Sequence, residues 1–236
     1  MKPFILGAVF ARGGSKSIPR KNIQLLGGKP LLAYAIETAR RISLIDDVIV
    51  STDNKEIAEV AKQYGAEVPF LRPAELATDE APMLLAQQHA VREYERLTKQ
   101  KVDVLVSIPT TSPLREDQDV QNCITMLLDS DADCVLTVTP AHRNPYFNMV
   151  TLDDQQRARL VIQPKVSVAR RQDAPSVYDV TTVAYAISTA YLQKNKPLIE
   201  GNVKAVIVPP ERALDIDTPL DWEIADFLIS KKIKAL

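Results

Sequence analysis

The stretch Phe4-Ile-Leu-Gly-Ala-Val-Phe10 places seven apolar residues in a row and runs into Ala11-Arg-Gly-Gly-Ser-Lys-Ser-Ile-Pro-Arg-Lys-Asn22. An apolar run without polar alternation is typical of a strand that is covered on both faces of a sheet. The segment after it combines two adjacent glycines and a hydroxyl with four cations, which are Arg12, Lys16, Arg20 and Lys21. This order predicts a buried first strand followed by a polar loop.

Short apolar runs alternate with helical patterns along the rest of the chain. Strands are expected at Phe4–Phe10, Asp47–Ser51, Val102–Ile108, Cys134–Val138, Thr181–Ile187 and Val203–Val208. Helices are expected at Pro30–Arg41, Lys55–Tyr64, Pro82–Leu97, Asp117–Leu128 and Pro219–Lys231. Because alternating strands and helices form right-handed crossovers, we predict an α/β fold with a doubly wound, mostly parallel sheet in a three-layer α/β/α sandwich.

Residues 140–176 interrupt this pattern with Pro, Asn, Gln, Asp and Arg and show no helical period. Strand-like pieces are expected only at Met149–Leu152 and Leu160–Gln163. A structureless loop of this length is unusual inside a compact domain. We therefore predict one domain over residues 1–236, into which residues 140–176 are inserted as an extended arm that contacts a second subunit.

Composition excludes several classes of protein. The 29 basic and 30 acidic residues nearly cancel, whereas binding to nucleic acid or anionic membranes usually needs a basic excess. No stretch approaches the roughly 20 apolar residues of a membrane span, and the first apolar run lacks a signal-peptide cleavage site. Cys123 and Cys134 form no CxxC pair and are interpreted as small hydrophobic residues in a reducing compartment. We predict a soluble, cytoplasmic protein with neither nucleic acid nor membrane as partner.

The loop from Ala11 to Asn22 has the composition of a phosphate-binding loop. The first loop after a strand in an open α/β sheet is a favoured ligand site, and its glycines let backbone N–H groups approach phosphate oxygens. Arginine grips two oxygens at once, whereas lysine acts as a mobile point charge. The spacing matches neither a Walker A loop nor GxGxxG, so a solvated basic loop remains the alternative interpretation.

Asp215 and Asp217 follow the expected strand Val203–Val208 and precede the expected helix at Pro219. Alternate residues of an extended segment point the same way, so both carboxylates can converge on one point. Two carboxylates with substrate phosphates are a usual way to hold Mg²⁺. The alternative is that Asp217 or Thr218 only caps the helix, with Pro219 at its first position.

These motifs together resemble the acylneuraminate cytidylyltransferase family, which makes CMP-activated sugar acids from CTP. The loop Ala11–Asn22 is followed by Gly28-Lys-Pro-Leu31, Ser51-Thr-Asp-Asn54, Leu71-Arg-Pro-Ala-Glu-Leu-Ala-Thr-Asp79, Thr111-Ser-Pro-Leu-Arg115, Arg170-Arg-Gln-Asp173 and Leu214-Asp-Ile-Asp-Thr-Pro219 with Asp221. Each of these segments is similar to a family motif, and they occur in the family's order. The resemblance implies a fold like that of the nucleotide-diphospho-sugar transferases, with a small dimerisation arm.

The resemblance also implies a reaction and its residues. The anomeric hydroxyl of a 2-keto-3-deoxy sugar acid, sialic acid or a related nonulosonate, attacks the α-phosphorus of CTP, and pyrophosphate leaves. The implied catalytic residues are Arg12, Lys21 and Asp217. Nucleotide contacts are implied for Arg12, Gly14, Ser15, Lys16, Lys21, Asn22 and Arg72. The remaining implied residues are Asp215 and Asp217 for Mg²⁺, and Arg170, Arg171, Gln172 and Thr182 for the acceptor. A homodimer is implied, with the two arginines contributed across it, and Arg115 is expected to brace its loop.

The chain departs from the family pattern at positions that the resemblance places near the sugar and the base. Pro109 replaces a glutamine near the sugar, Pro82-Met83 replaces a serine pair near the base, and Thr181-Thr182 replaces Asn-Gly. The acceptor and the base therefore stay open. A sugar-1-phosphate nucleotidyltransferase, and a nucleotide-binding regulator without turnover, are the alternatives.

Overall fold

Strand β1 (Ile5–Phe10) lies inside a six-stranded sheet, between β4 and β5, as the apolar run predicts. The structure, a computed structural model, describes residues 2–164 and 168–234. The other strands of this sheet are β4 (Asp47–Ser51), β5 (Val104–Ser107), β6 (Cys134–Pro140), β9 (Tyr178–Ser188) and β10 (Val203–Ile207). Their order across the sheet is β10-β6-β9-β5-β1-β4.

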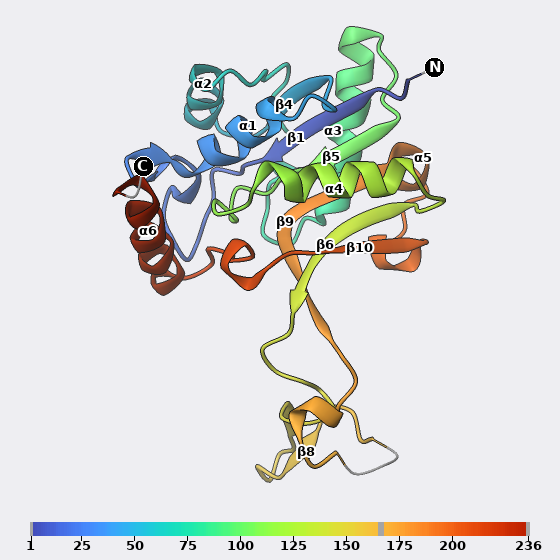
Figure 1. Cartoon of the computed structure of the whole chain (residues 1–236). Coiled ribbons are helices and arrows are strands. Elements are labelled where there is room, and N and C mark those ends of the chain that lie inside the picture. Colours follow the sequence, from blue (N-terminus) through green and yellow to red (C-terminus); the bar gives the residue numbers. More distant parts are fainter. Residues whose placement is uncertain (1, 165–167, 235–236) are drawn as a thin grey trace.

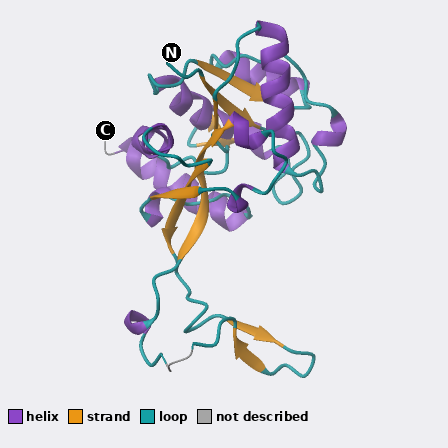
Figure 2. Ribbon diagram, turned by 90° about the vertical axis from the view of Figure 1, so that its right-hand side faces the viewer, coloured by secondary structure: helices purple, strands orange, loops and turns teal. Residues whose placement is uncertain are grey.

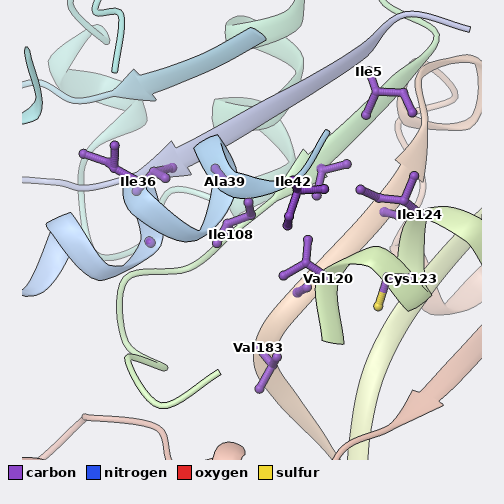
Figure 3. Close-up of a cluster of buried hydrophobic side chains, with 14 of the residues drawn as sticks. Ile5, Ile36, Ala39, Ile42, Ile108, Val120, Cys123, Ile124 and Val183 are labelled. Atoms are coloured by element: carbon purple, nitrogen blue, oxygen red, sulfur yellow. The ribbon is translucent and has the colours of Figure 1, made fainter. Parts of the chain in front are cut away.

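Helices cover both faces of the sheet (Figure 1). One face packs against α1 (Leu31–Arg41), α2 (Lys55–Gln63) and α4 (Asp117–Leu128). The other face packs against α3 (Met83–Thr98) and the short α5 (Thr189–Leu192). Both layers are needed because successive side chains of a strand point to opposite faces. In β1, Ile5 and Val9 join the first layer, part of which is drawn in Figure 3, while Leu6 and Phe10 join the second.

Helix α6 (Pro219–Lys234) closes the end of the sheet that carries the first loop. It packs its Ala225 and Ile229 against Ile18, Leu26 and other residues of a small third core. The hairpin of β2 (Leu25–Leu26) and β3 (Lys29–Pro30) lies against it. A Cβ on Gly27 would come within 2.5 Å of Ile229, and the φ of this residue is +57°, so this contact requires glycine.

The predicted mostly parallel α/β sandwich is confirmed, but β9 runs antiparallel to both of its neighbours. The chain leaves the sheet at the end of β6 and, after the segment between these strands, re-enters it at the same end, as β9. Two neighbouring strands connected at the same end of a sheet run in opposite directions. The predicted bounds of β4 and α4 are confirmed to the residue, while α5 was not predicted. Cys123 and Cys134 are both buried thiols, and burial raises the pKa of each to about 12.

The segment between β6 and β9 extends away from the sheet as an arm (Figures 1 and 2). Its far end carries the hairpin of β7 (Val150–Leu152) and β8 (Ala158–Leu160). The bounds of the strand predicted at Leu160–Gln163 are wrong. The strand that pairs with β7 begins two residues earlier, at Ala158, and ends at Leu160. Within the described residues, no helix is both long and apolar enough to cross a membrane.

Candidate active site

The candidate site lies where the parallel strands β1, β4 and β5 end, because their carboxyl ends meet at one edge of the sheet. The loop after β1 lies beside the turn after β4: the N–H of Gly13 donates to Asp53 at 2.9 Å, and Asn54 packs against Gly13. A Cβ on Gly14, in contrast, would meet nothing within 4 Å. Asn54 therefore leaves little room for a side chain at position 13, while the space around Gly14 is open to a ligand.

Cations of the loop gather around one carboxylate. Arg12 lies 2.6 Å from Asp79, and Lys16 contacts the other oxygen of the same carboxylate. These ion pairs, Lys16 first, lower the pKa of Asp79. Asp79 thus holds the position that an anionic ligand would take between Arg12 and Lys16. Its role was not predicted, although it ends one of the motifs quoted above.

Arg72 shares a cavity of about 240 Å³ with Arg12 and Asp79. Its side chain is buried, and its Nε and one Nη have no hydrogen-bond partner among the described residues. Burial lowers the pKa of Arg72, against the opposing effect of Asp53. A buried guanidinium with free donors is costly unless an anion satisfies it. This geometry agrees with the predicted nucleotide-phosphate contact and not with a surface salt bridge.

Asn22 connects the loop to the segment after β5. Its side-chain nitrogen donates to the carbonyl of Arg12 at 2.9 Å, and its oxygen accepts from the hydroxyl of Thr110 at 2.7 Å. Both ends of the amide therefore hold the loop in shape. A nucleotide contact of this side chain stays a prediction.

Lys21 joins the loop to the acidic segment, 196 residues away in the sequence at Asp217. Its Nζ donates to the carbonyl of Ile216 at 2.7 Å and lies 3.5 Å from Asp217 Oδ1. The Lys21 side chain is 13% exposed and that of Asp217 is 72% exposed. The ammonium group is thus held between the two motifs, while the Asp217 carboxylate faces outward.

Asp215 lies deeper than Asp217. Its carboxylate lies beside the hydroxyls of Thr111 and Thr182, and the Thr111 hydroxyl donates to that of Thr182 at 3.3 Å. Its Oδ1 is buried without a partner among the described residues. Burial raises the pKa of Asp215, and the nearby charge of Asp217 adds to this effect, against the lowering by the two hydroxyls. Thr182, predicted to contact the acceptor, therefore has a protein partner at the acidic pair.

The alternative reading of the acidic segment as a helix cap can be tested directly. The cap of α6 is made by Thr218 and Asp221, since Asp221 accepts from the backbone N–H of Thr218 at 2.7 Å and from its hydroxyl at 2.8 Å. The N–H of Asp221 in turn donates to the Thr218 hydroxyl at 3.3 Å, which completes a capping box. The Asp217 carboxylate lies beside Lys21 instead, so the cap does not explain it.

The donor set fits Mg²⁺ bound jointly with a substrate. Asp217 lies close enough to raise the pKa of Asp215, and one oxygen of Asp215 is buried and free. Mg²⁺ commonly binds through one or two carboxylates with phosphates and water. Within the part of the chain that the structure describes, no group of three or more His, Cys, Asp or Glu side chains is placed to hold a metal. A site of two carboxylates would leave the other coordination positions of Mg²⁺ to substrate phosphates and water.

A larger cavity of about 760 Å³ adjoins the acidic pair. Thr111 and Thr182, which lie beside Asp215, are on its wall. Met83 lines both this cavity and the smaller one that contains Arg12 and Arg72, here called the cationic cavity. Apart from Gln87, Ser107, Thr110 and Asn195, the rest of its lining is apolar or aromatic: Phe10, Pro82, Leu84, Pro109, Tyr185, Pro197 and Leu198. The departures at Pro82-Met83 and Pro109 thus meet in one cavity.

The remaining predicted acceptor residues lie on the arm. Arg170 makes two hydrogen bonds to Asp173, at 2.9 and 3.0 Å, and Arg171 donates to the carbonyl of Ala141 at 2.9 Å. Arg171 and Gln172 line a separate cavity of about 400 Å³ at the base of the arm. None of the arm's described residues lines either cavity of the body, so one protomer does not bring them to the acidic pair.

Comparison with known proteins agrees with this geometry. Residues 6–216 match the family model described as cytidylyltransferase. The chain belongs to the cytidylyltransferase family. It is thus an enzyme, a nucleotidyltransferase of the CMP-sugar acid synthetase type, and the prediction of this activity class is confirmed.

Relatives of this cytidylyltransferase cover nearly its whole length. CMP-N,N'-diacetyllegionaminic acid synthase of Campylobacter jejuni is 35% identical over 97% of this chain and 96% of its own. Post-translational flagellin modification protein B of Campylobacter coli is 33% identical over the same shares. In fold, the chain is similar to a CMP:2-keto-3-deoxy-manno-octonic acid synthetase solved with CTP, with a TM-score of 0.74 at 15% identity, over 97% of this chain and 99% of that one.

Proposed function

We propose that this cytidylyltransferase transfers CMP from CTP to the anomeric hydroxyl of a nonulosonic acid. The hydroxyl oxygen bonds to the α-phosphorus, the bond from the α-phosphorus to the β-phosphate oxygen breaks, and pyrophosphate leaves with that electron pair. The observation that carries this proposal is the position of Lys21. This residue belongs to the cationic loop and contacts the segment of Asp215 and Asp217. Nucleotidyl transfer depends mainly on positioning and charge neutralisation, which this arrangement provides.

The triphosphate is proposed to bind in the cationic cavity. Arg12 and Lys16 exchange the Asp79 carboxylate for phosphate oxygens, and the free donors of Arg72 turn to the nucleotide. The open backbone at Gly14 and the Ser15 hydroxyl complete the cradle. The cations that would bind the triphosphate are already close together, because Arg12 and Lys16 both contact the Asp79 carboxylate.

Asp215 and Asp217 are the residues that would hold Mg²⁺. When bound, this ion neutralises charge on the phosphate oxygens and helps align the attacking and leaving groups. The exposed Asp217 carboxylate can also accept the proton of the attacking hydroxyl, since it faces outward beside Lys21. The Lys21 ammonium keeps this segment close to the phosphates through its bond to the carbonyl of Ile216.

The acceptor is proposed to occupy the cavity of about 760 Å³, whose wall carries Thr111 and Thr182 beside Asp215. The apolar side chains of Met83, Pro109 and Leu198 favour acyl groups over hydroxyl groups, because a hydroxyl buried there would lose its hydrogen bonds. A relative named for a diacetylated sugar acid is consistent with such an acceptor.

The cation for the acceptor's carboxylate is proposed to come from a second copy of the chain. Arg171 has one donor on a carbonyl and no acidic partner among its described contacts, whereas Arg170 is already paired with Asp173. We therefore favour Arg171 of the partner's arm for this role. The homodimer, the Mg²⁺ requirement and the cytoplasmic location stay predictions.

A pyrophosphate-release assay tests the proposal. CTP is combined with N,N'-diacetyllegionaminate, pseudaminate, N-acetylneuraminate or 3-deoxy-manno-octulosonate, with ATP, GTP and UTP as nucleotide controls. We expect release with CTP, and about tenfold higher kcat/KM for a diacetylated acceptor than for the octulosonate, as the burial of one or two methyl groups allows. A sugar 1-phosphate serves as the acceptor control, and release only with this compound would overturn the proposed acceptor. Release with no pair would favour a regulator.

A further inference from the structure

Arg115 is a buried arginine close enough to Asp215 for the two charges to interact. Arg115 Nε donates to the carbonyl of Val183 at 2.9 Å, and one of its Nη atoms donates to the carbonyls of Pro109 and, at 3.4 Å, Thr182. Its other Nη is buried with no partner among the described residues. The guanidinium therefore ties the loop after β5 to strand β9, as the predicted bracing role requires.

Strand β9 is irregular where Arg115 contacts it. The pairing of β6 with β9 shifts register at Thr137, opposite residues 181–184. The Thr137 hydroxyl accepts from the hydroxyl of Thr181 at 2.7 Å and from the N–H of Ala184 at 3.2 Å. This bulge removes Thr182 and Val183 from the ladder, so that their carbonyls are free for Arg115.

The same bulge aims the Thr182 side chain at Asp215. The Thr182 hydroxyl lies beside the Asp215 carboxylate and contacts two further hydroxyls, those of Ser112 at 2.7 Å and Thr111 at 3.3 Å. The Thr111 hydroxyl donates to Thr182 and Ser112 can do the same, so the single proton of the Thr182 hydroxyl is left for Asp215. One side of the carboxylate is thereby held, while Oδ1 stays free.

We propose that Arg115 and Thr182 are positioning residues, which fix the Asp215 carboxylate in the orientation that a divalent cation requires. Arg115 acts through the backbone at residue 182, and Thr182 acts through its hydroxyl. The inference concerns the metal role of Asp215 and so rests on the proposed function. It also gives a physical reason for Thr182 in this chain, because a glycine at this position would have no hydroxyl to donate.

The test compares Thr182→Val, which has nearly the same shape without the hydroxyl, with Thr182→Ser, which keeps it. Mn²⁺ binding is measured by electron paramagnetic resonance on the enzyme with CTP and no acceptor, beside kcat, KM and the melting temperature. We expect Thr182→Val to weaken Mn²⁺ binding about 10- to 100-fold and to lower kcat to a similar degree, as loss of an outer-sphere partner does. The KM for CTP and the melting temperature should change little, and Thr182→Ser should restore most of the affinity.

Arg115→Lys provides the second arm of the test, since lysine keeps the charge but cannot reach three carbonyls at once. We expect Mn²⁺ affinity between that of the wild type and that of Thr182→Val. Wild-type Mn²⁺ affinity and kcat in Thr182→Val would overturn the inference. So would equal losses in Thr182→Val and Thr182→Ser. Absence of pyrophosphate release by the wild type would instead refute the proposed function, and the Mn²⁺ comparison would still decide the inference.

Discussion

The nucleotide half and the acceptor half of this site are completed to different degrees within one protomer. The nucleotide half has its cations in place, with Arg12, Lys16 and Arg72 around one cavity or its edge. The acceptor half has a large apolar cavity, but its predicted arginines lie on the arm. This difference favours CTP recognition within a single chain and supports our proposal that a second copy supplies the cation for the acceptor.

The arm differs from the body in its packing as well. Side chains of Met149, Val150, Leu152, Val161 and Ile162 are exposed near its far end, whereas the sheet buries most of its apolar residues. Exposed apolar groups gathered on one segment commonly mark an interaction surface. These exposed side chains of the arm support our proposal that it contacts a second copy of the chain.

The largest expected effect on kcat comes from Asp217, which is proposed to contact both the nucleotide and the acceptor. Asp217→Asn should lower kcat by about 1000-fold, because loss of a metal ligand costs several kcal/mol of transition-state stabilisation. The melting temperature should be unchanged, since the carboxylate is exposed and does not form the cap of α6. Stopped assays of pyrophosphate release and a thermal melt measure both quantities. Rates near those of the wild type would reject the metal role of Asp217.

Arg72→Met tests the nucleotide half alone. We expect the KM for CTP to rise about 100-fold, as the loss of a buried charged hydrogen-bond donor to phosphate implies, with the KM for the acceptor little changed. Arg92→Met on the exposed face of α3 is the matched control. A larger change in the acceptor KM than in the CTP KM would assign Arg72 to the other half of the site.

Leu152→Glu tests the acceptor half through the arm. Val150 and Leu152 are alternate residues of β7 and share one face, so a buried charge there should dissociate a dimer. Sedimentation should show the monomer, with acceptor kcat/KM reduced about 10-fold and CTP affinity kept. Thr151→Glu, on the other face of the same strand, serves as the control. A dimer that survives Leu152→Glu would contradict the proposed interface.

Asp79→Asn should give the smallest effect, and in the opposite direction. Removing the carboxylate that pairs with Arg12 and Lys16 should lower the KM for CTP about 2- to 5-fold, because exposed ion pairs are each worth about 1 kcal/mol or less. Glu80→Gln is the neighbouring control. An increase in KM would show that Asp79 contributes to nucleotide binding and does not compete with it.

Much of the fold could be predicted from local patterns. The bounds of β4 and α4, and the buried first strand, follow from apolar period and turn chemistry, which act over a few residues. The strand predicted at Leu160–Gln163 failed because a short exposed hairpin has no buried face to set its register. The short helix α5 carries too few residues to show a helical period.

The sequence by itself determined the cationic loop, the acidic pair and the order of motifs, because each is a local string of residues. Only the tertiary structure decided that Lys21 donates to the carbonyl of Ile216 next to Asp217, that Thr182 lies beside Asp215, and that β9 runs antiparallel. These contacts depend on strand order and on a bulge in β9, which join residues far apart in the chain. Local periodicity carries no information about such partners, since it describes only which face of an element is buried.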